Sequence, residues 1–361
     1  MDQHLSTVPS SSDDPVVQAE PPAAPRPKWP FVLAGILLVI GVAIAVLWPI
    51  RVPYYALSPG PVYDTSDFVT AEGGQKDGNG EMFFLTVSLK EANVFEYLAG
   101  LADERVDIAP REHFRPPGVT QEEQRREGLA LMDQSKTDAT FVALTELGYE
   151  PTLIGTGAVV IETVEGTGAN GVLLPEDIIV AIDGELVEFR SDVIELLADL
   201  EIGDAVVVTI ERIDAEGNIE ELDQRIVLGP HVDDPTQPMI GILLDNNEPI
   251  VEFPVVVKID SNNIGGPSAG MMFTLQIMDQ LTEEDLTNGH RIAGTGTIGR
   301  DGIVGPIGGV RQKVFGAIEA GAHAILVPAG NFDEALEAGG DSIIVVKIET
   351  IDDAIDFLAT L

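Results

Sequence analysis

The pattern of apolar and polar residues divides the chain into segments of different character. Residues 31–50 are twenty residues without a charge, and a helix of this length rises about 30 Å, which is enough to cross a bilayer. Residues 1–30 are rich in proline, serine, alanine and aspartate, a composition typical of disorder. We therefore expect a disordered N-terminal tail at residues 1–30 and a transmembrane helix at residues 31–50.

Residues 51–148 have the alternating and helical spacings of a mixed α+β connecting region. The stretch 52–63 is typical of strand and turn, and residues 81–89 alternate as a strand. Residues 93–101 and 121–147 have helical spacing. The apolar stripe predicted for the second helix consists of Leu129, Leu131, Met132, Ala139, Ala143 and Leu147.

Residues 149–232 change to short β-rich runs separated by glycine and aspartate turns. Strands are predicted at 158–164, 177–182 and 205–212, with one helix at 191–200. Such a segment makes a small β-rich domain. The stretch 233–238 has the composition of a linker.

A third module is predicted at residues 239–361. It begins with a strand at 250–259, a glycine-rich turn at 265–270 and a helix at 268–280. A glycine-rich strand region at 291–309 and a second helix at 310–320 follow. Further helices and strands continue to residue 361. The chain is therefore an α/β multi-domain protein.

The charge balance excludes one class of partner. Sixty acidic residues against twenty basic ones give a net charge of −40, whereas binding to phosphates requires clustered lysine and arginine. Sixteen acidic residues fall in 176–223, against Arg190 and Arg212. We expect no nucleic-acid partner and interpret the acidic run as a solvated surface.

The residue types present also exclude several kinds of chemistry. The absence of cysteine removes disulfides, thiolate catalysis and cysteine-based zinc sites, and the five histidines lack metal-ligand spacing. Two Gly-x-Gly-x-x-Gly strings, at 166–171 and 294–299, do not open a helix within a dinucleotide-binding βαβ unit. No Gly-Lys dipeptide occurs, so no Walker A loop is present. We expect no cofactor, metal or nucleotide.

Ser268 and Lys313 are the candidate catalytic pair. Taken alone, Ser268 could be a helix cap and Lys313 a solvated surface residue. Together, a serine on a glycine-rich turn and a lysine on a second glycine-marked element are typical of a Ser–Lys hydrolase. His290 is an alternative base, since it is the histidine nearest to Ser268 in sequence.

The chemistry of this pair sets two physical requirements. Lys313 must be neutral to accept a proton, and burial among apolar neighbours such as Val310 and Val314 would lower its pKa. If Ser268 begins a helix, free backbone N–H groups near it can hold a developing oxyanion. Gly265, Gly266 and Gly270 would permit the close approach that this arrangement needs.

Several motifs of the third module resemble the proteolytic domain of Lon-type proteases, over about residues 240–361. They are Gly266-Pro267-Ser268-Ala269-Gly270, Thr295-Gly296, Gly302, Pro306–Gly309, Lys313 and Ala320–Asn331. The resemblance implies that Ser268 is the nucleophile and Lys313 the general base, and that Thr295 bonds the lysine amine. The chain departs from the family pattern at Gly265, where an acidic residue is common, and at Gly299, where a threonine is replaced.

The segment 171–184 resembles the bacterial PDZ signature through Leu173, Asp177, Ile178, Ile179, Ile182, Asp183 and Gly184. The nearest candidate for a carboxylate-binding loop is Gly155–Val159. An N-terminal anchor, an inserted PDZ-like β-rich domain at 149–232 and a C-terminal Lon-type α+β domain at 239–361 together resemble the YlbL-type membrane-anchored Lon-like serine proteases.

This resemblance implies a membrane-anchored, ATP-independent serine endopeptidase of unfolded or membrane-proximal extracytoplasmic proteins. The PDZ-like domain would capture protein or peptide substrates or regulate the enzyme, and Lon-type domains commonly form homo-oligomeric rings. Arg26 and Lys28 before the apolar segment, against Arg51 after it, favour a cytoplasmic N-terminus and an uncleaved signal anchor. Two alternatives remain: a membrane-anchored PDZ scaffold with an idle Lon-like domain, and a structural envelope protein.

Overall fold

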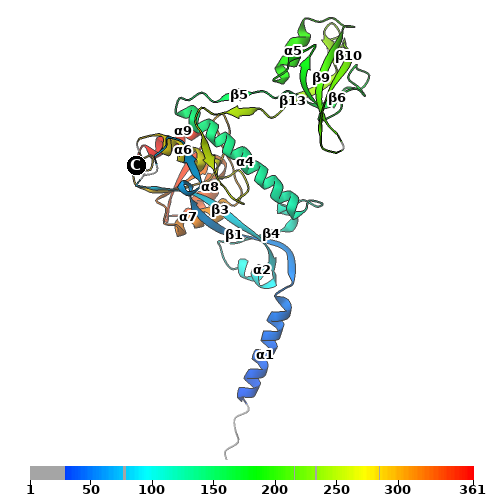
Figure 1. Cartoon of the computed structure of the whole chain (residues 1–361). Helices are drawn as coiled ribbons and strands as arrows, with labels where there is room; N and C mark the ends of the chain where they lie inside the picture. Colours follow the sequence, from blue (N-terminus) through cyan, green and yellow to red (C-terminus); the bar gives the residue numbers. More distant parts are fainter. Residues whose placement is uncertain (1–28, 76–78, 215, 232–233, 284) are drawn as a thin grey trace, which may run out of the picture.

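The chain folds into a helix, a body and a β-rich module that follow one another from bottom to top in Figure 1. The computed structural model describes residues 29–75, 79–214, 216–231, 234–283 and 285–361. The module is an insertion in the body. The chain leaves the body through strand β5 (Thr152–Ile154) and returns through β14 (Ile250–Glu252), and these two strands pair antiparallel as a ribbon.

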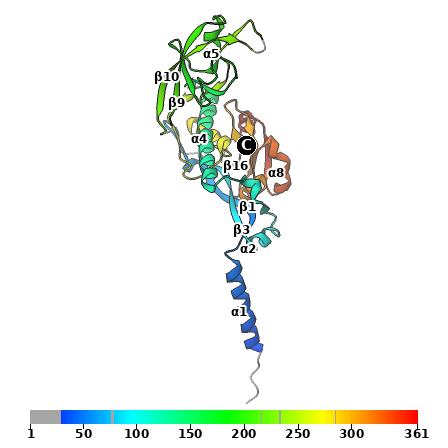
Figure 2. The ribbon, with the colours of Figure 1, turned by 90° about the vertical axis from the view of Figure 1, so that its right-hand side faces the viewer.

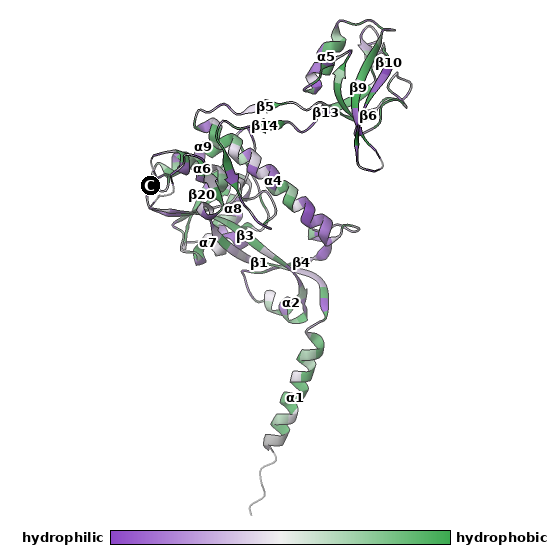
Figure 3. Cartoon of the chain, viewed as in Figure 1, coloured by the Kyte–Doolittle hydropathy of each residue, from purple (hydrophilic) through white to green (hydrophobic). Residues whose placement is uncertain are grey.

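Helix α1 (Trp29–Leu47) contains most of the predicted apolar segment, and Figure 3 shows it in hydrophobic colours along much of its length. Its described side chains are exposed. Among the described residues, none of the helices combines the length and the apolar character needed to cross a membrane. The transmembrane helix predicted at 31–50 is therefore not confirmed, and the predicted tail falls, up to residue 28, outside the described residues.

The body is built on one mixed six-stranded sheet. Its strands, in spatial order, are β20 (Ile344–Ile348), β19 (Ala324–Pro328), β16 (Arg291–Gly294), β3 (Glu81–Asn93), β1 (Arg51–Asp64) and β4 (Asp107–Pro110). The first four run parallel, and β1 is antiparallel to both β3 and β4. The region predicted as a connector, 51–148, therefore supplies half of the sheet that the C-terminal residues complete.

Helices cover both faces of this sheet because its strands are buried on both sides. Along β19, Ala324 and Leu326 belong to one core cluster, whereas Ile325 and Val327 belong to the other. The first cluster includes α6 (Gly270–Leu281) and α9 (Ile351–Leu358), with α4 (Gln121–Glu146) packed on α6. The second includes α7 (Val310–Glu319) and α8 (Phe332–Gly339). Figure 2 shows α4 and α8 on opposite sides of the body.

Helix α4 is the longest helix of the body and begins with a capping box. The hydroxyl of Thr120 accepts from Glu123 N–H, and the Glu123 carboxylate accepts from Thr120 N–H. The buried residues of the helix are Met132, Ser135, Ala139, Thr140, Val142, Ala143 and Leu144. The stripe predicted from sequence is corrected at Leu131, which is 45% exposed, while Ser135 is buried.

The inserted module is a β-sheet domain with its own core. Its sheet consists of β10 (Ile219–Val227), β9 (Ala205–Ile213), β7 (Ile178–Ile182), β6 (Ala158–Thr163) and β13 (Ile242–Asn246), with α5 (Arg190–Ala198) packed against it. Within the module, the buried carboxylate of Asp177 accepts two hydrogen bonds of 2.7 Å from Arg212. Asp177, one of the acidic residues of 176–223 interpreted as a solvated surface, is therefore buried and paired with Arg212.

The boundaries of the module differ from those predicted. Strand β13 pairs with β6, so the module continues past 232, and residues after 239 still belong to it. Of the predicted linker, residues 234–237 form a turn, and Pro238 begins β12 (Pro238–Met239), which pairs with β11 (Gly229–Pro230). Pairing across the sheet cannot be read from the local composition that suggested a linker.

The strand predicted at 250–259 is divided in two. β14 ends at Glu252, and β15 (Val257–Ile259) begins after Pro254 and pairs with β2 (Val69–Ala71). Proline has no N–H to donate to a ladder, which explains the break. The remaining elements are α2 (Val94–Gly100), α3 (Arg111–Phe114), β8 (Glu185–Leu186), β17 (Thr297–Ile298), β18 (Val304–Gly305) and two short 3₁₀ turns, Thr65–Asp67 and Ala329–Asn331.

Candidate active site

Ser268 lies in the loop that leads into α6. We refer to residues 263–269 as the nucleophile loop. Gly266 has φ of 92°, a left-handed conformation that favours glycine. Ala269 is the N-cap of α6, so Ser268 stands one residue before the cap. The helix predicted to begin at Ser268 therefore begins two residues later, and the serine is on the turn itself.

Lys313 is carried by the first turn of α7. The helix is preceded by Gly309, whose φ is 68°. A Cβ atom at Gly309 would lie 2.9 Å from Val87 Cγ1 on β3, so only glycine lets α7 approach the sheet this closely. This approach leaves Lys313 only 2% exposed.

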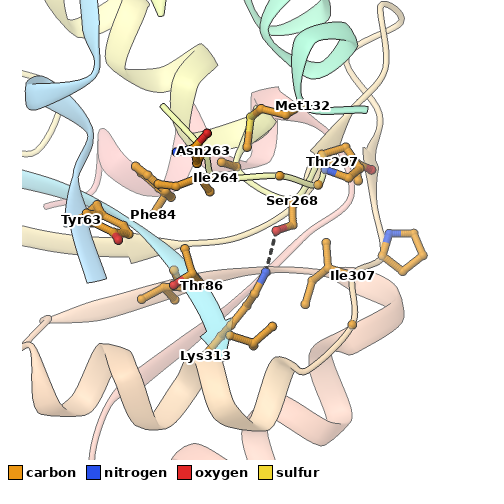
Figure 4. Close-up of a pocket in the computed structure, with 18 residues that line it drawn as sticks. Tyr63, Phe84, Thr86, Met132, Asn263, Ile264, Ser268, Thr297, Ile307 and Lys313 are labelled. Carbon is orange, nitrogen blue, oxygen red and sulfur yellow. Dashed lines mark hydrogen bonds between the residues drawn. The ribbon is translucent and has the colours of Figure 1, made fainter. Parts of the chain in front are cut away.

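The structure brings Ser268 and Lys313 together although they are 45 residues apart. Lys313 Nζ lies 2.7 Å from Ser268 Oγ, and Figure 4 shows the lysine side chain rising from α7 to meet the serine. Nζ also lies 2.8 Å from Oγ1 of the buried Thr295. The Thr295 hydroxyl donates to the backbone oxygen of Ser268 at 3.1 Å. The three predicted side chains thus form one hydrogen-bonded group.

Burial changes the acidity of the lysine. Because desolvation disfavours the charged amine, it lowers the pKa of Lys313 from 10.5 to about 7. Val310 and Val314, predicted as apolar neighbours, are buried in the core cluster on this side of the sheet. At neutral pH a large fraction of the amine is therefore unprotonated, which is the form that can accept a proton from a serine.

A cavity of about 580 Å³ opens at the pair. Among its described lining residues, Lys313 is the one charged side chain, and the apolar side chains come from the sheet, the nucleophile loop, α4 and the loop before α7. They include Tyr63, Phe84, Leu85, Val87, Met132, Ile264, Pro306 and Ile307; several are labelled in Figure 4. The cavity is suited to an apolar group, and none of its described lining residues is a carboxylate that would hold Lys313 charged.

One wall of the cavity is an incompletely paired strand. Strand β16 ends at Gly294, opposite Phe84 of β3. Beyond Phe84, β3 has β1 as its strand neighbour on one side, and its residues Leu85–Val87 line the cavity. An extended peptide can add to such an edge by backbone hydrogen bonds.

Two backbone N–H groups beside the serine are free to bind a ligand. Within the described residues, neither Ser268 N–H nor Ala269 N–H donates to another protein atom. Both residues line the cavity. Free N–H groups at the start of a helix can stabilise an oxyanion, so the site offers backbone donors beside the Ser268 hydroxyl and the Lys313 amine.

The remaining predicted residues fall into two groups. Gly266, Pro267, Ala269 and Gly270 all belong to the nucleophile loop or the first turn of α6. His290 does not line the cavity, and its ring lies 4.6 Å from that of His323. In the part of the chain that is described, no group of histidine, aspartate and glutamate is arranged to hold a metal ion.

Sequence reasoning missed the contribution of α4 to the site. Met132 lines the cavity, and Ser135 Oγ donates to the backbone oxygen of Pro267 at 3.0 Å. No spacing relative to Ser268 could reveal these contacts, because α4 lies more than a hundred residues earlier in the chain. The buried serine within an apolar stripe was the one available signal.

A second cavity, of about 670 Å³, lies in the inserted module between α5 and residues 237–244. It borders β13, an edge strand of the module's sheet. The predicted carboxylate-binding loop, Gly155–Val159, does not line this groove. Its last two residues, Ala158 and Val159, belong to β6 and pair with both β7 and β13, so they lie inside the sheet rather than at its edge.

Two domain families match the sequence. Residues 259–359 match the Lon protease (S16) C-terminal proteolytic domain, and residues 139–223 match the PDZ domain. The chain therefore contains a Lon-type proteolytic domain and a PDZ domain. The first match includes the whole Ser268–Thr295–Lys313 group, whereas strands β1 and β3 of the same sheet lie outside it.

Curated relatives are Lon proteases of modest identity. That of Campylobacter concisus is 29% identical over 185 residues, which are 42% of this chain and 22% of the relative. Lon protease 2 of Bacillus subtilis is 31% identical over 106 residues, 29% of this chain and 18% of the relative. The chain thus spans less than a quarter of the length of these relatives. The matches support a peptidase.

Among solved structures, the PDZ domain of an SdrC-like protein from Listeria innocua is 26% identical to the part of the chain that it matches. It covers 26% of this chain and 97% of its own length, with a TM-score of 0.22. The PDZ domain of the SdrC-like protein from Listeria monocytogenes is 28% identical and covers 24% of this chain and 86% of its own length, with a TM-score of 0.21.

Proposed function

We propose that the protein is a serine endopeptidase that uses a Ser268–Lys313 dyad. The observation that carries this proposal is the buried, uncompensated amine of Lys313 at 2.7 Å from Ser268 Oγ. A solvated lysine or a serine that merely caps a helix would not require this arrangement. The Lon-type proteolytic domain around the pair supports peptide bonds as the substrate.

The reaction follows from the positions of these groups. The neutral amine accepts the Ser268 proton while Oγ bonds to the substrate carbonyl carbon, and the resulting oxyanion accepts hydrogen bonds from the free N–H groups of Ser268 and Ala269. The ammonium then gives its proton to the leaving nitrogen, which releases an amine and leaves an ester on Ser268. Water then attacks this ester while Lys313 accepts the water proton. Transfer of this proton from Lys313 to Ser268 Oγ releases the acid.

The substrate that best fits the site is an extended, unfolded segment with an apolar side chain near the cleaved bond. The partly unpaired strand β3 offers backbone groups at Leu85–Val87, and the cavity beside it is apolar apart from Lys313. Folded domains lack a free extended backbone. We propose that hydrolysis proceeds without ATP, since the chain contains no Gly-Lys dipeptide and hence no Walker A loop.

The PDZ domain is proposed to capture peptides in the groove between α5 and β13. An edge strand beside an apolar groove is the geometry of β-strand addition. Substrates of different length would distinguish two roles of the captured peptides, delivery to the dyad and regulation of the dyad. Short peptides bypass capture, so only regulation would change their turnover.

We also propose that residues 31–50 anchor the protein and that the domains lie outside the cytoplasm. This proposal is supported by the twenty uncharged residues of that stretch and by Arg26 and Lys28 before it. Extraction of membranes at alkaline pH tests the anchor. Accessibility of the PDZ domain to protease in intact cells tests the orientation.

Two substitutions test the proposed reaction. Full-length protein should hydrolyse fluorescein-labelled casein without ATP, and both Ser268→Ala and Lys313→Ala should reduce turnover to background. A fluorophosphonate should label the wild type and leave Ser268→Ala unlabelled. Wild-type turnover no faster than that of Ser268→Ala would instead indicate a PDZ scaffold with an idle Lon-type domain.

A further inference from the structure

The first eighteen residues of helix α4, 121–138, lie outside the residues matched by either domain family, yet they hold the nucleophile loop in place. The N–H of Gly266 donates to the backbone oxygen of Gly128 at 2.7 Å. A Cβ atom on Gly265 would lie 3.1 Å from the carbonyl carbon of Gly128, which is a tight contact. The departure from the family pattern at Gly265 thus coincides with a close approach of helix and loop.

Ser135 of α4 contacts the residue that precedes Ser268 in the chain. Its side chain is 3% exposed, and its hydroxyl donates to the backbone oxygen of Pro267 at 3.0 Å. A Cβ atom on Gly270 would lie 2.7 Å from Ser135 Oγ. Gly270 therefore gives the hydroxyl access to the carbonyl that precedes Ser268.

This hydrogen bond acts on the peptide unit that carries the nucleophile. The carbonyl of Pro267 and the N–H of Ser268 belong to one planar trans unit, in which they point in opposite directions. Gly270 N–H donates to the same carbonyl at 3.2 Å, so Ser135 and Gly270 together set the direction of the Ser268 N–H, which has no acceptor among the described residues. They also set the position of the Ser268 Cα atom, and hence of Oγ.

We propose that Ser135 is a positioning residue for Ser268. It holds the Pro267–Ser268 peptide unit so that the N–H can receive the oxyanion while Oγ stays within reach of Lys313. This inference rests on the proposed peptidase function and extends the site to a helix contributed by the N-terminal half of the chain. Ser135 itself does not line the cavity.

The test compares two hydroxyl deletions on α4 in the full-length protein. Ser135→Ala removes the hydrogen bond to the loop, and kcat for labelled casein should fall roughly 10- to 100-fold, with KM within about twofold. Thr140→Ala is the matched control, because Thr140 is also buried but its hydroxyl donates to Lys136 O within α4. Its kcat should change less than about twofold.

Two further measurements separate positioning from loss of structure. Ser135→Cys keeps the volume but offers only a weak donor, so it should also lose kcat while keeping the thermal unfolding temperature. The pH profile of fluorophosphonate labelling should keep its midpoint in both Ser135 variants, because the burial of Lys313 is unchanged.

Three results would overturn the inference. They are equal kcat in Ser135→Ala and Thr140→Ala, full activity in Ser135→Cys, or a displaced midpoint of the pH profile. An active wild type with an unaffected Ser135→Ala would remove this inference alone. A wild type no faster than Ser268→Ala would remove the proposed function with it.

Discussion

Lys313 and Thr295 meet through a hydrogen bond of 2.8 Å between the amine and the threonine hydroxyl. The hydroxyl proton of Thr295 is already donated to the backbone oxygen of Ser268, so Thr295 can only accept from the amine. A neutral amine that donates here keeps its lone pair for another partner. Ser268 Oγ, at 2.7 Å, is then placed to give its proton to that lone pair.

Thr295→Val should lower kcat roughly 10- to 100-fold, the effect of losing one hydrogen bond to a group that becomes charged. Valine matches threonine in shape but cannot accept from the lysine, so the amine loses its orientation. Steady-state kinetics on labelled casein checks this expectation. Thr140→Val, which removes a buried hydroxyl that bonds within α4, is the control, and equal losses in both variants would contradict the role of Thr295.

The pH dependence of acylation should report Lys313. Because burial lowers the pKa of this amine to about 7, the active neutral form is lost as the pH falls through that value. The rate of labelling by a fluorophosphonate should therefore rise about tenfold per pH unit below pH 7 and level off above it. A rate that is flat between pH 5 and 8 would argue against lysine as the base.

Lys313→Arg should abolish turnover at every pH, since a guanidinium does not release its proton. The same exchange at the exposed Lys258 is the matched control and should leave kcat unchanged. Retention of activity by Lys313→Arg would assign the base to another group.

Lys313→Met should stabilise the fold while it removes activity. The folded pKa of Lys313 is lowered from 10.5 to about 7, so between these values the unfolded chain binds a proton that the folded chain does not. Wild-type stability therefore rises with pH across this window and is lowest below it. Methionine carries no proton, so its gain in unfolding temperature should be larger at pH 6 than at pH 10, as measured by calorimetry at the two pH values.

The PDZ groove should be sensitive to charge at Ile194. This residue of α5 lines the groove and is 67% exposed, so Ile194→Glu should weaken peptide binding at least about tenfold with little loss of stability. Leu186 is 69% exposed but lies outside the groove, and Leu186→Glu is the matched control. Titration of a fluorescent peptide panel into each variant checks this, and equal binding by both would place the peptide site elsewhere.

The local pattern predicted most elements of the body and module to within a few residues. The helix at 121–147 is found at Gln121–Glu146 and that at 310–320 at Val310–Glu319, because caps and apolar spacing are local properties. Strand pairing was harder to predict from the local pattern. The place of β13 in the module depends on β6, about eighty residues earlier in the chain, and the role of β3 in the body depends on residues 291–294.

By itself, the sequence determined the types of group available for chemistry. It contains a serine on a glycine-rich turn and a lysine among apolar residues, and it lacks cysteine, metal-ligand spacing and a Walker A loop. Only the tertiary structure decided that Ser268, Thr295 and Lys313 meet, that the lysine is buried enough to lose its proton, and that Ser135 of α4 reaches the nucleophile loop. Residue type is a property of the chain, whereas burial and distance arise when distant segments pack together.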